Sequence, residues 1–135
     1  MPFAQPESAP PLRTEPVGSA ERGGREIRRQ LPGQTIEIID RLASRAEQLV
    51  DSGMTYDARG LTTFRIADAQ PLAAQIDCKR SFAFSRGDWD TRVAVTSSAS
   101  ATRAEFHLTN LLEAYENGCR IFARAWSATI PRDHI

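Results

Sequence analysis

Residues 72–84 read LAAQIDCKRSFAF, a stretch in which apolar and polar side chains alternate. One set of alternate positions is apolar except for Arg80, and the other set is polar from Gln75 to Ser81. A period of two places successive side chains on opposite faces of a strand. The stretch therefore predicts a long antiparallel strand with one buried face and one solvated face.

The segments on both sides of this stretch show the same alternation. Residues 62–66 alternate upstream of it, and residues 68–71 have the composition of a turn. Downstream, an Arg-Gly-Asp turn at 86–88 leads into the alternating segment 89–95. Glycine and proline at these positions interrupt strands, so we expect three consecutive antiparallel strands here.

Residues 103–116 fit a strand and a helix equally well by spacing, and their flank decides between the two. Asn117-Gly118, directly after them, is the strongest short signal for a β-hairpin. A hairpin with arms 104–116 and 119–130 accounts for the apolar positions on both sides. With about six or seven strands and short turns, the sequence predicts an all-β protein, an antiparallel jelly-roll-like β-sandwich.

The N-terminal segment is expected to lie outside this sandwich. Five of the eight prolines fall within residues 1–22, and proline removes a backbone donor. We therefore expect residues 1–22 to form an extended leader and residues 23–135 to form the sandwich. At the start of the sandwich, residues 25–39 predict a hairpin about Pro32-Gly33.

Residues 40–50 give a different signal from the strands around them. Leu42, Ala46 and Leu49 recur at the spacing of one helical face. Asp40 is a suitable N-cap for such a helix, and an Asp-Ser-Gly sequence directly afterwards would end it. A short helix near residues 40–50 is therefore expected between the strands.

The net charge and the hydrophobic pattern of the chain limit the kinds of molecule that it is expected to bind. The 135 residues include 17 basic and 17 acidic side chains, so the formal net charge is zero. Sequence-independent binding of nucleic acid needs a surplus of Lys and Arg against the phosphates, and we expect no nucleic-acid partner. No apolar run approaches the length of a bilayer span, so we expect no membrane partner.

The two cysteines bear on the cellular compartment. The N-terminal segment lacks the apolar core of a secretory signal peptide, which predicts a cytoplasmic protein. Thiols are kept reduced in that compartment. We therefore interpret Cys78 and Cys119, which are far apart in sequence, as buried free cysteines that act as small hydrophobic residues.

Residue types that carry catalysis do not gather in this sequence. The G-x-S-x-G elbow that positions a nucleophilic serine in α/β-hydrolases is absent. His107 lies in a predicted strand beside Glu105 and is interpreted as a solvated or hydrogen-bonded sheet residue, and His134 lies next to the C-terminus. Cysteine and histidine occur singly rather than in the pairs typical of metal sites. We expect no catalytic residue, no metal and no cofactor.

Aromatic and arginine side chains cluster towards the C-terminus. Arg120, Arg124 and Trp126 share one set of alternate positions, where they would form a cation–π ladder or a surface that packs on another domain. Arginine and large aromatic residues are enriched in interfaces. We therefore name Trp89, Arg120, Phe122, Arg124 and Trp126 as candidate interdomain or interface residues.

Several motifs between residues 64 and 135 resemble one family of serine hydrolases. Residues 86–93 (RGDWDTRV) resemble its RGDW-x-R segment, and residues 68–74 (DAQPLAA) resemble its DDPLSA segment. Residues between 106 and 126 continue the similarity, and the ending IPRDHI at 130–135 resembles its terminal IPRDHV. The family is the cocaine esterase and X-prolyl dipeptidyl peptidase group, and the similar region is the extreme C-terminus of its C-terminal domain.

The resemblance implies a jelly-roll β-sandwich that packs against an α/β-hydrolase domain. In that family the catalytic serine, aspartate and histidine lie upstream of the similar region, so no residue here inherits a catalytic role. The family's C-terminal domain is larger than this chain, which implies that part of the sandwich is missing. Residues 41–50 depart from the family, which has a strand-like stretch containing glycine there.

The sequence supports two hypotheses of function. In the first, the chain is a non-catalytic accessory domain, or a truncated fragment, of a serine hydrolase that acts on esters or prolyl peptides. Its partner would be the α/β-hydrolase catalytic domain, or another copy bound through an exposed sheet edge. In the second, it is an independent β-sandwich binding module that recognises its ligand through Trp89 and Trp126.

Overall fold

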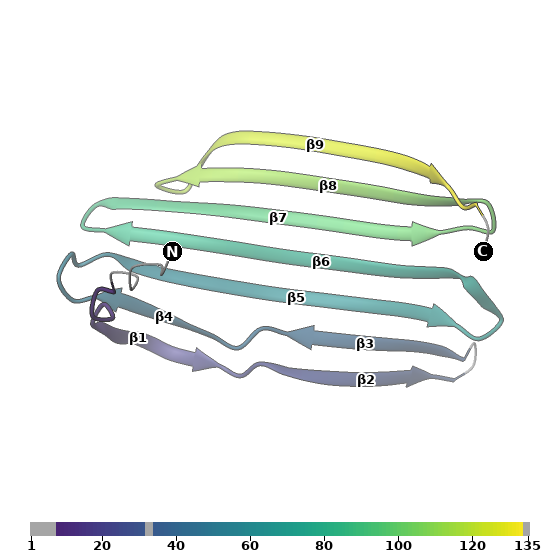
Figure 1. Cartoon of the computed structure of the whole chain (residues 1–135), viewed down its shortest axis with the longest axis horizontal. Coiled ribbons are helices and arrows are strands. Elements are labelled where there is room, and N and C mark those ends of the chain that lie inside the picture. Colours follow the sequence, from purple (N-terminus) through teal and green to yellow (C-terminus); the bar gives the residue numbers. More distant parts are fainter. Residues whose placement is uncertain (1–7, 32–33, 134–135) are drawn as a thin grey trace, which may run out of the picture.

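The computed structural model describes residues 8–31 and 34–133, and these residues form one open antiparallel β-sheet without a helix (Figure 1). The expectation of an all-β antiparallel protein is confirmed. The described residues accordingly include no helix that could cross a bilayer. The strands are β1 (Thr14–Glu21), β2 (Gly24–Gln30), β3 (Thr35–Arg41), β4 (Ser44–Leu49), β5 (Thr55–Ala67), β6 (Gln70–Arg86), β7 (Trp89–Ala101), β8 (Glu105–Glu116) and β9 (Cys119–Pro131).

The sheet follows the order of the chain. β1 and β2 lie end to end along one edge, and β4 and β3 lie end to end beside them (Figure 1). The long strands β5 to β9 then follow one after another, each antiparallel to its predecessor. Two end-to-end pairs and five long strands give seven positions across the sheet. The nine strands of the described residues exceed the expected six or seven, because the N-terminal segment supplies β1 and the expected helix is the strand β4.

The backbone of Gly23 approaches the backbone of Ala43 closely. This contact lies at the break between β1 and β2 and at the break between β3 and β4. A Cβ atom at Gly23 would lie 2.4 Å from the backbone N of Ala43, so only glycine allows this approach. Leu42 leaves the regular ladder, but its N–H donates to the Gly60 carbonyl at 2.9 Å. The interruption thus divides the strands without detaching them from the sheet.

The helix expected near residues 40–50 is wrong. Ser44–Leu49 is β4, which pairs with β1 on one side and with β5 on the other. The interruption at Leu42 and Ala43 reverses which alternate positions face each side of the sheet. The apolar residues of the two short segments before and after it therefore recur together at the spacing of a helical face. Pairing on both sides overrides that local signal.

The expectation that residues 1–22 lie outside the sheet is wrong for Thr14–Glu21, which forms β1. Residues 1–7 lie outside the described part of the chain. Val50 N–H donates to the Arg13 carbonyl, and the next pair along the ladder is Thr14 opposite Leu49. Because backbone groups alternate in direction along an antiparallel strand, the backbone of Pro16 faces away from β4. Pro16 therefore removes no hydrogen bond between the strands. Proline is acceptable where the missing donor faces outward from a sheet edge.

The turns follow the sequence prediction closely. Asn117 and Gly118 have φ values of 47° and 78°, as the two central residues of a type I′ hairpin turn require. Gly87 in the turn between β6 and β7 also has a positive φ, 59°. The hairpin expected at residues 25–39 is confirmed as β2 and β3, and its turn residues 32–33 lie outside the described residues.

A single layer has almost no interior. Among the described residues no large side chain is fully buried, and the one buried hydrophobic residue, Ile39, is 7% exposed. The accessible surface of the chain is 10435 Å², whereas a compact monomer of this mass exposes about 7,000 Å². A sandwich needs a second layer, which the described residues do not supply, so the jelly-roll part of the expectation stays a prediction.

Candidate functional site

The candidate functional site is one whole face of the sheet, which we call the apolar face. The register aligns Phe64, Ile76, Ala99, Leu108 and Ala128 across five adjacent strands. Because side chains alternate between the two sides of a strand, the even-spaced neighbours of these residues share their face. Ten large apolar residues on this face are more than a third exposed: Ile27, Phe64, Ile66, Phe82, Phe84, Trp89, Val93, Phe122, Trp126 and Ile130.

The apolar face is hollowed over β3 and β5 to β8. A shallow cavity of about 440 Å³ lies there, with Ile38, Phe64, Ile76, Ala99 and Phe106 in its lining. These five side chains come from five different strands, so the hollow forms only when the whole sheet assembles. Its apolar lining suits hydrophobic side chains of a covering layer.

A polar band crosses the middle of the apolar face. The Arg80 side chain lies over Gly60, where a Cβ atom would come within 2.7 Å of Arg80 Nη1. Arg80 Nη2 donates to Thr62 Oγ1 at 3.0 Å, and the Thr62 hydroxyl donates to Cys78 Sγ at 3.7 Å. Asn110 lies in the same row on β8. A covering layer should therefore offer polar groups at its middle and apolar groups on both sides.

At the β2–β3 end of this polar band, Arg25 and Asp40 form an ion pair. Arg25 Nε donates to Asp40 Oδ1 at 2.7 Å, and Arg25 Nη2 donates to Asp40 Oδ2 at 2.8 Å. The hydrogen bond from the Arg25 guanidinium, together with its charge, lowers the pKa of Asp40 below the ordinary value.

We expect the contribution of this pair to stability to disappear in acid. Because the folded pKa of Asp40 is below the unfolded value, the contribution is present above the unfolded pKa of about 3.9 and is lost as pH falls through the folded pKa. The change in stability should be small because Arg25 is exposed and the Asp40 side chain is about a third exposed. An NMR titration of the Asp40 carboxyl carbon should give a lower midpoint than in the variant Arg25→Gln, and equal midpoints would contradict the pairing.

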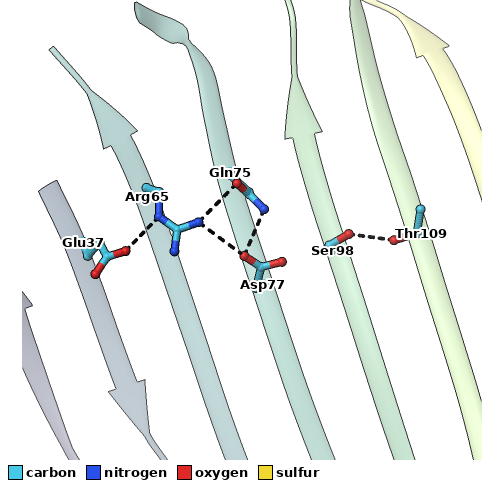
Figure 2. Close-up of polar contacts among 6 residues, drawn as sticks. All are labelled: Glu37, Arg65, Gln75, Asp77, Ser98 and Thr109. Atoms are coloured by element: carbon cyan, nitrogen blue, oxygen red, sulfur yellow. Dashed lines mark hydrogen bonds and ion pairs between the residues drawn. The ribbon is translucent and has the colours of Figure 1, made fainter. Parts of the chain in front are cut away.

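Polar side chains join the strands on the opposite side of the sheet, the polar face (Figure 2). Arg65 Nε donates to Glu37 Oε1 at 2.8 Å, and Arg65 Nη1 donates to Gln75 Oε1 at 3.3 Å. Gln75 Nε2 donates to Asp77 Oδ2 at 3.1 Å, which lies 3.9 Å from Arg65 Nη1 (Figure 2). This network links β3, β5 and β6 and places one guanidinium between two carboxylates.

Hydroxyl and imidazole groups continue the polar face over β7 to β9. The hydroxyl oxygens of Ser98 and Thr109 are 2.6 Å apart (Figure 2). His107 Nδ1 lies 3.4 Å from Thr129 Oγ1, and His107 Nε2 lies 3.6 Å from Glu105 Oε2. His107 is therefore a hydrogen-bonded, half-exposed residue of a solvated sheet face.

The two thiols lie on different strands, Cys78 on β6 and Cys119 on β9. Cys78 is half-buried, but Cys119 is exposed at the start of β9, which corrects the expectation that both are buried. Both are free thiols. Within residues 8–31 and 34–133, no group of three or more His, Cys, Asp or Glu side chains is arranged to hold a metal ion. His134 lies outside the described residues.

Four of the five predicted interface residues lie on the apolar face. Phe122, Arg124 and Trp126 line β9, and the Arg124 guanidinium lies 5.0 Å from the centre of the Trp126 ring. Trp89 begins β7, and its Nε1 donates to Glu116 Oε1 at 3.2 Å. These residues therefore belong to one surface, and Arg124 and Trp126 make the cation–π contact that is one of the two interpretations of their pattern.

Arg120 corrects the expected cation–π ladder. The register shifts by one residue between Ala114 and Tyr115, so Ile121 is an extra residue in β9. Such a β-bulge reverses the alternation of side chains beyond it. Arg120 therefore points to the polar face, where its Nη1 donates to Glu113 Oε1 at 2.9 Å.

Most of the apolar face was missed as a candidate interface because its residues were expected to be buried inside a sandwich. The period-two pattern of residues 72–84 identifies the strand face but contains no information about what covers it. Comparison of the chain with protein-family models, with curated proteins and with solved structures finds no match. The apolar face is therefore interpreted from its own geometry and from its motifs.

Proposed function

We propose that this chain is a non-catalytic accessory layer of a serine hydrolase in the cocaine esterase and X-prolyl dipeptidyl peptidase group, which acts on esters or prolyl peptides. Its apolar face would pack on a second β-layer of the same accessory domain, beside an α/β-hydrolase domain that carries the catalysis. The observation that carries the proposal is the exposure of ten large apolar residues on one face of a single sheet.

The surface area of the chain supports a covering layer. The accessible surface of 10435 Å² exceeds the value of about 7,000 Å² for a compact monomer by about 3,400 Å². A large obligate interface buries about 2,000–5,000 Å² in total, half of it on each partner. The excess is thus larger than the share of one chain in a typical obligate interface, as one half of a sandwich requires.

Two segments that carry the family resemblance have structural roles, which supports an accessory domain. Trp89, from the segment RGDWDTRV, anchors the start of β7 to Glu116 on β8. Arg132, from the segment IPRDHI, donates from Nη1 to the carbonyls of Leu72 at 3.2 Å and Thr102 at 3.1 Å. These contacts tie the ends of neighbouring strands together rather than forming a reaction centre.

We expect the purified chain to hydrolyse neither p-nitrophenyl acetate nor an X-prolyl p-nitroanilide faster than buffer does. Nucleophilic catalysis by serine needs a base within hydrogen-bond reach, and in the proposal that set belongs to the separate hydrolase domain. The variant Ser98→Ala, which removes one hydroxyl of the Ser98–Thr109 pair, is the matched control. Turnover that a serine-directed reagent abolishes would refute the proposal.

We also propose a cytoplasmic location for the chain. The exposed free thiol of Cys119 supports this location, because exposed thiols stay reduced in the cytoplasm.

A further inference from the structure

The two edges of the sheet differ in their protection against pairing with another strand. The β1–β2 edge is divided into two short strands, contains Pro16 and carries four charged side chains between residues 25 and 29. Short strands, proline and charge are the usual means of blocking edge-to-edge pairing. β9 is one strand of 13 residues, exposed at every residue, with its one proline at the end. Within the described residues, only β8 pairs with β9.

The outward backbone groups of β9 can be assigned from its pairing with β8. Glu105 lies directly opposite Pro131, and Arg132 N–H donates to the Ala104 carbonyl at 2.8 Å. Residues of antiparallel strands turn their N–H and C=O groups alternately towards and away from the neighbour. The odd-numbered residues from Ala123 to Thr129 therefore present donors and acceptors away from β8.

We propose that β9 pairs antiparallel with β9 of a second copy of this chain, with Trp126 at the two-fold axis. This register uses the whole segment Phe122–Ile130, which lies between the β-bulge at Ile121 and the proline at 131. The odd-numbered residues of the two copies then exchange about eight backbone hydrogen bonds. The proposal concerns the edge of the sheet and is independent of what covers its apolar face.

Side-chain pairing favours this register over its neighbours. With Trp126 at the axis, the two Trp126 side chains are opposite each other and Arg124 faces the partner's Ala128. With Arg124 at the axis, two guanidinium groups would be opposed, which is destabilising. With Ala125 at the axis, the paired segment would be shorter because Ile121 interrupts it. Registers of the other parity would place odd-numbered residues of one copy opposite even-numbered residues of the other. No hydrogen-bonded ladder could form, because the backbone groups of the even-numbered residues bond to β8.

Two single-cysteine variants test the register, Ala125→Cys and Ser127→Cys, each in a background with both native cysteines changed to serine. The proposed register places position 125 of one copy opposite position 127 of the other, at a Cα separation of about 5.5 Å that a disulfide can span. A mixture of the two variants, one of them isotope-labelled, should form the mixed disulfide at least about tenfold more than either variant forms its own. Mass spectrometry distinguishes the products. Absence of the mixed disulfide, or efficient cross-linking of Ala125→Cys with itself, would overturn the register.

A proline substitution tests whether the β9 edge holds the two copies together. Ala125→Pro removes an outward donor and leaves the inward bonds of β9 to β8 intact. The measurement is made with Phe64→Lys and Phe82→Lys present, which removes association through the apolar face. With the edge intact, sedimentation should give twice the chain mass of 14.9 kDa, and with Ala125→Pro it should give the single mass.

Ala125→Ser, which keeps the backbone donor, is the matched control and should remain dimeric. A monomer with the edge intact, or a dimer that persists with Ala125→Pro, would overturn the proposal. Both readouts report on β9 alone, so hydrolytic activity in the purified chain would refute the proposed function without affecting them.

Discussion

The double substitution Phe64→Lys and Phe82→Lys should weaken association through the apolar face by about a thousandfold. Both phenylalanines lie on central strands, β5 and β6, and are 41% and 48% exposed. Burial of such a side chain by a covering layer contributes about 2 kcal/mol, and two of them therefore contribute about 4 kcal/mol. Without its covering layer, the chain should bind the dye ANS strongly and sediment as species larger than a dimer, whereas the double variant should bind little ANS and sediment no larger than the dimer paired through β9.

The matched control for this experiment is Thr63→Lys with Ala83→Lys, which adds the same charges to the same strands on the polar face. This control should associate like the unaltered chain, because its lysines remain in water. The same pair of variants tests the accessory role directly. A hydrolase of the proposed group that lacks its matching C-terminal segment should become soluble when co-expressed with the control, but not with Phe64→Lys and Phe82→Lys. Equal behaviour of the two variants would contradict a role for the apolar face.

Gly118→Val should lower the stability of the sheet by about 2 kcal/mol, because Gly118 has a positive φ of 78° that β-branched residues rarely adopt. A Cβ atom at this position meets nothing within 4 Å, so the cost comes from the backbone rather than from a clash. The melting temperature should fall by about 5–10 °C at fixed protein concentration.

Gly24→Val is the matched control for the hairpin substitution. Gly24 begins the edge strand β2, has no positive φ, and also has open space where a Cβ atom would lie. Valine there should be neutral or stabilising, because β-branched residues favour strands. If Gly118→Val and Gly24→Val change the melting temperature equally, the Asn117-Gly118 turn does not determine the stability of the hairpin.

The regular part of the sheet could be predicted from local pattern because β6 to β9 are long and separated by strong turn signals. Two local signals are sufficient for this prediction, the alternation over residues 72–84 and the Asn117-Gly118 turn, because each is formed by residues that are neighbours in sequence. The prediction for the N-terminal part of the sheet is wrong where the strands are interrupted. At Ala43 the backbone of another segment fills the space beside Gly23, and no local pattern contains that contact.

The candidate site was predictable in its composition but not in its full extent. Trp89, Phe122, Arg124 and Trp126 are predicted as interface residues because large aromatic and arginine side chains are enriched in interfaces. The position of Arg120 could not be predicted, since the single extra residue at Ile121 reverses its face and depends on the register with β8. The exposure of Phe64 and its neighbours depends on whether a second layer is present, and alternation gives the same pattern in both cases.

The serial order of the strands also determines how this sheet grows. From β6 onward each strand pairs with the one made just before it, through turns of two or three residues, so every step closes a short loop at small entropic cost. β1 differs, because it pairs with β4 and must wait until that segment has been synthesised. The ribosome therefore releases each of the strands β6 to β9 onto a neighbour that already exists, and β9, the edge with the most open backbone, follows β8 in this order.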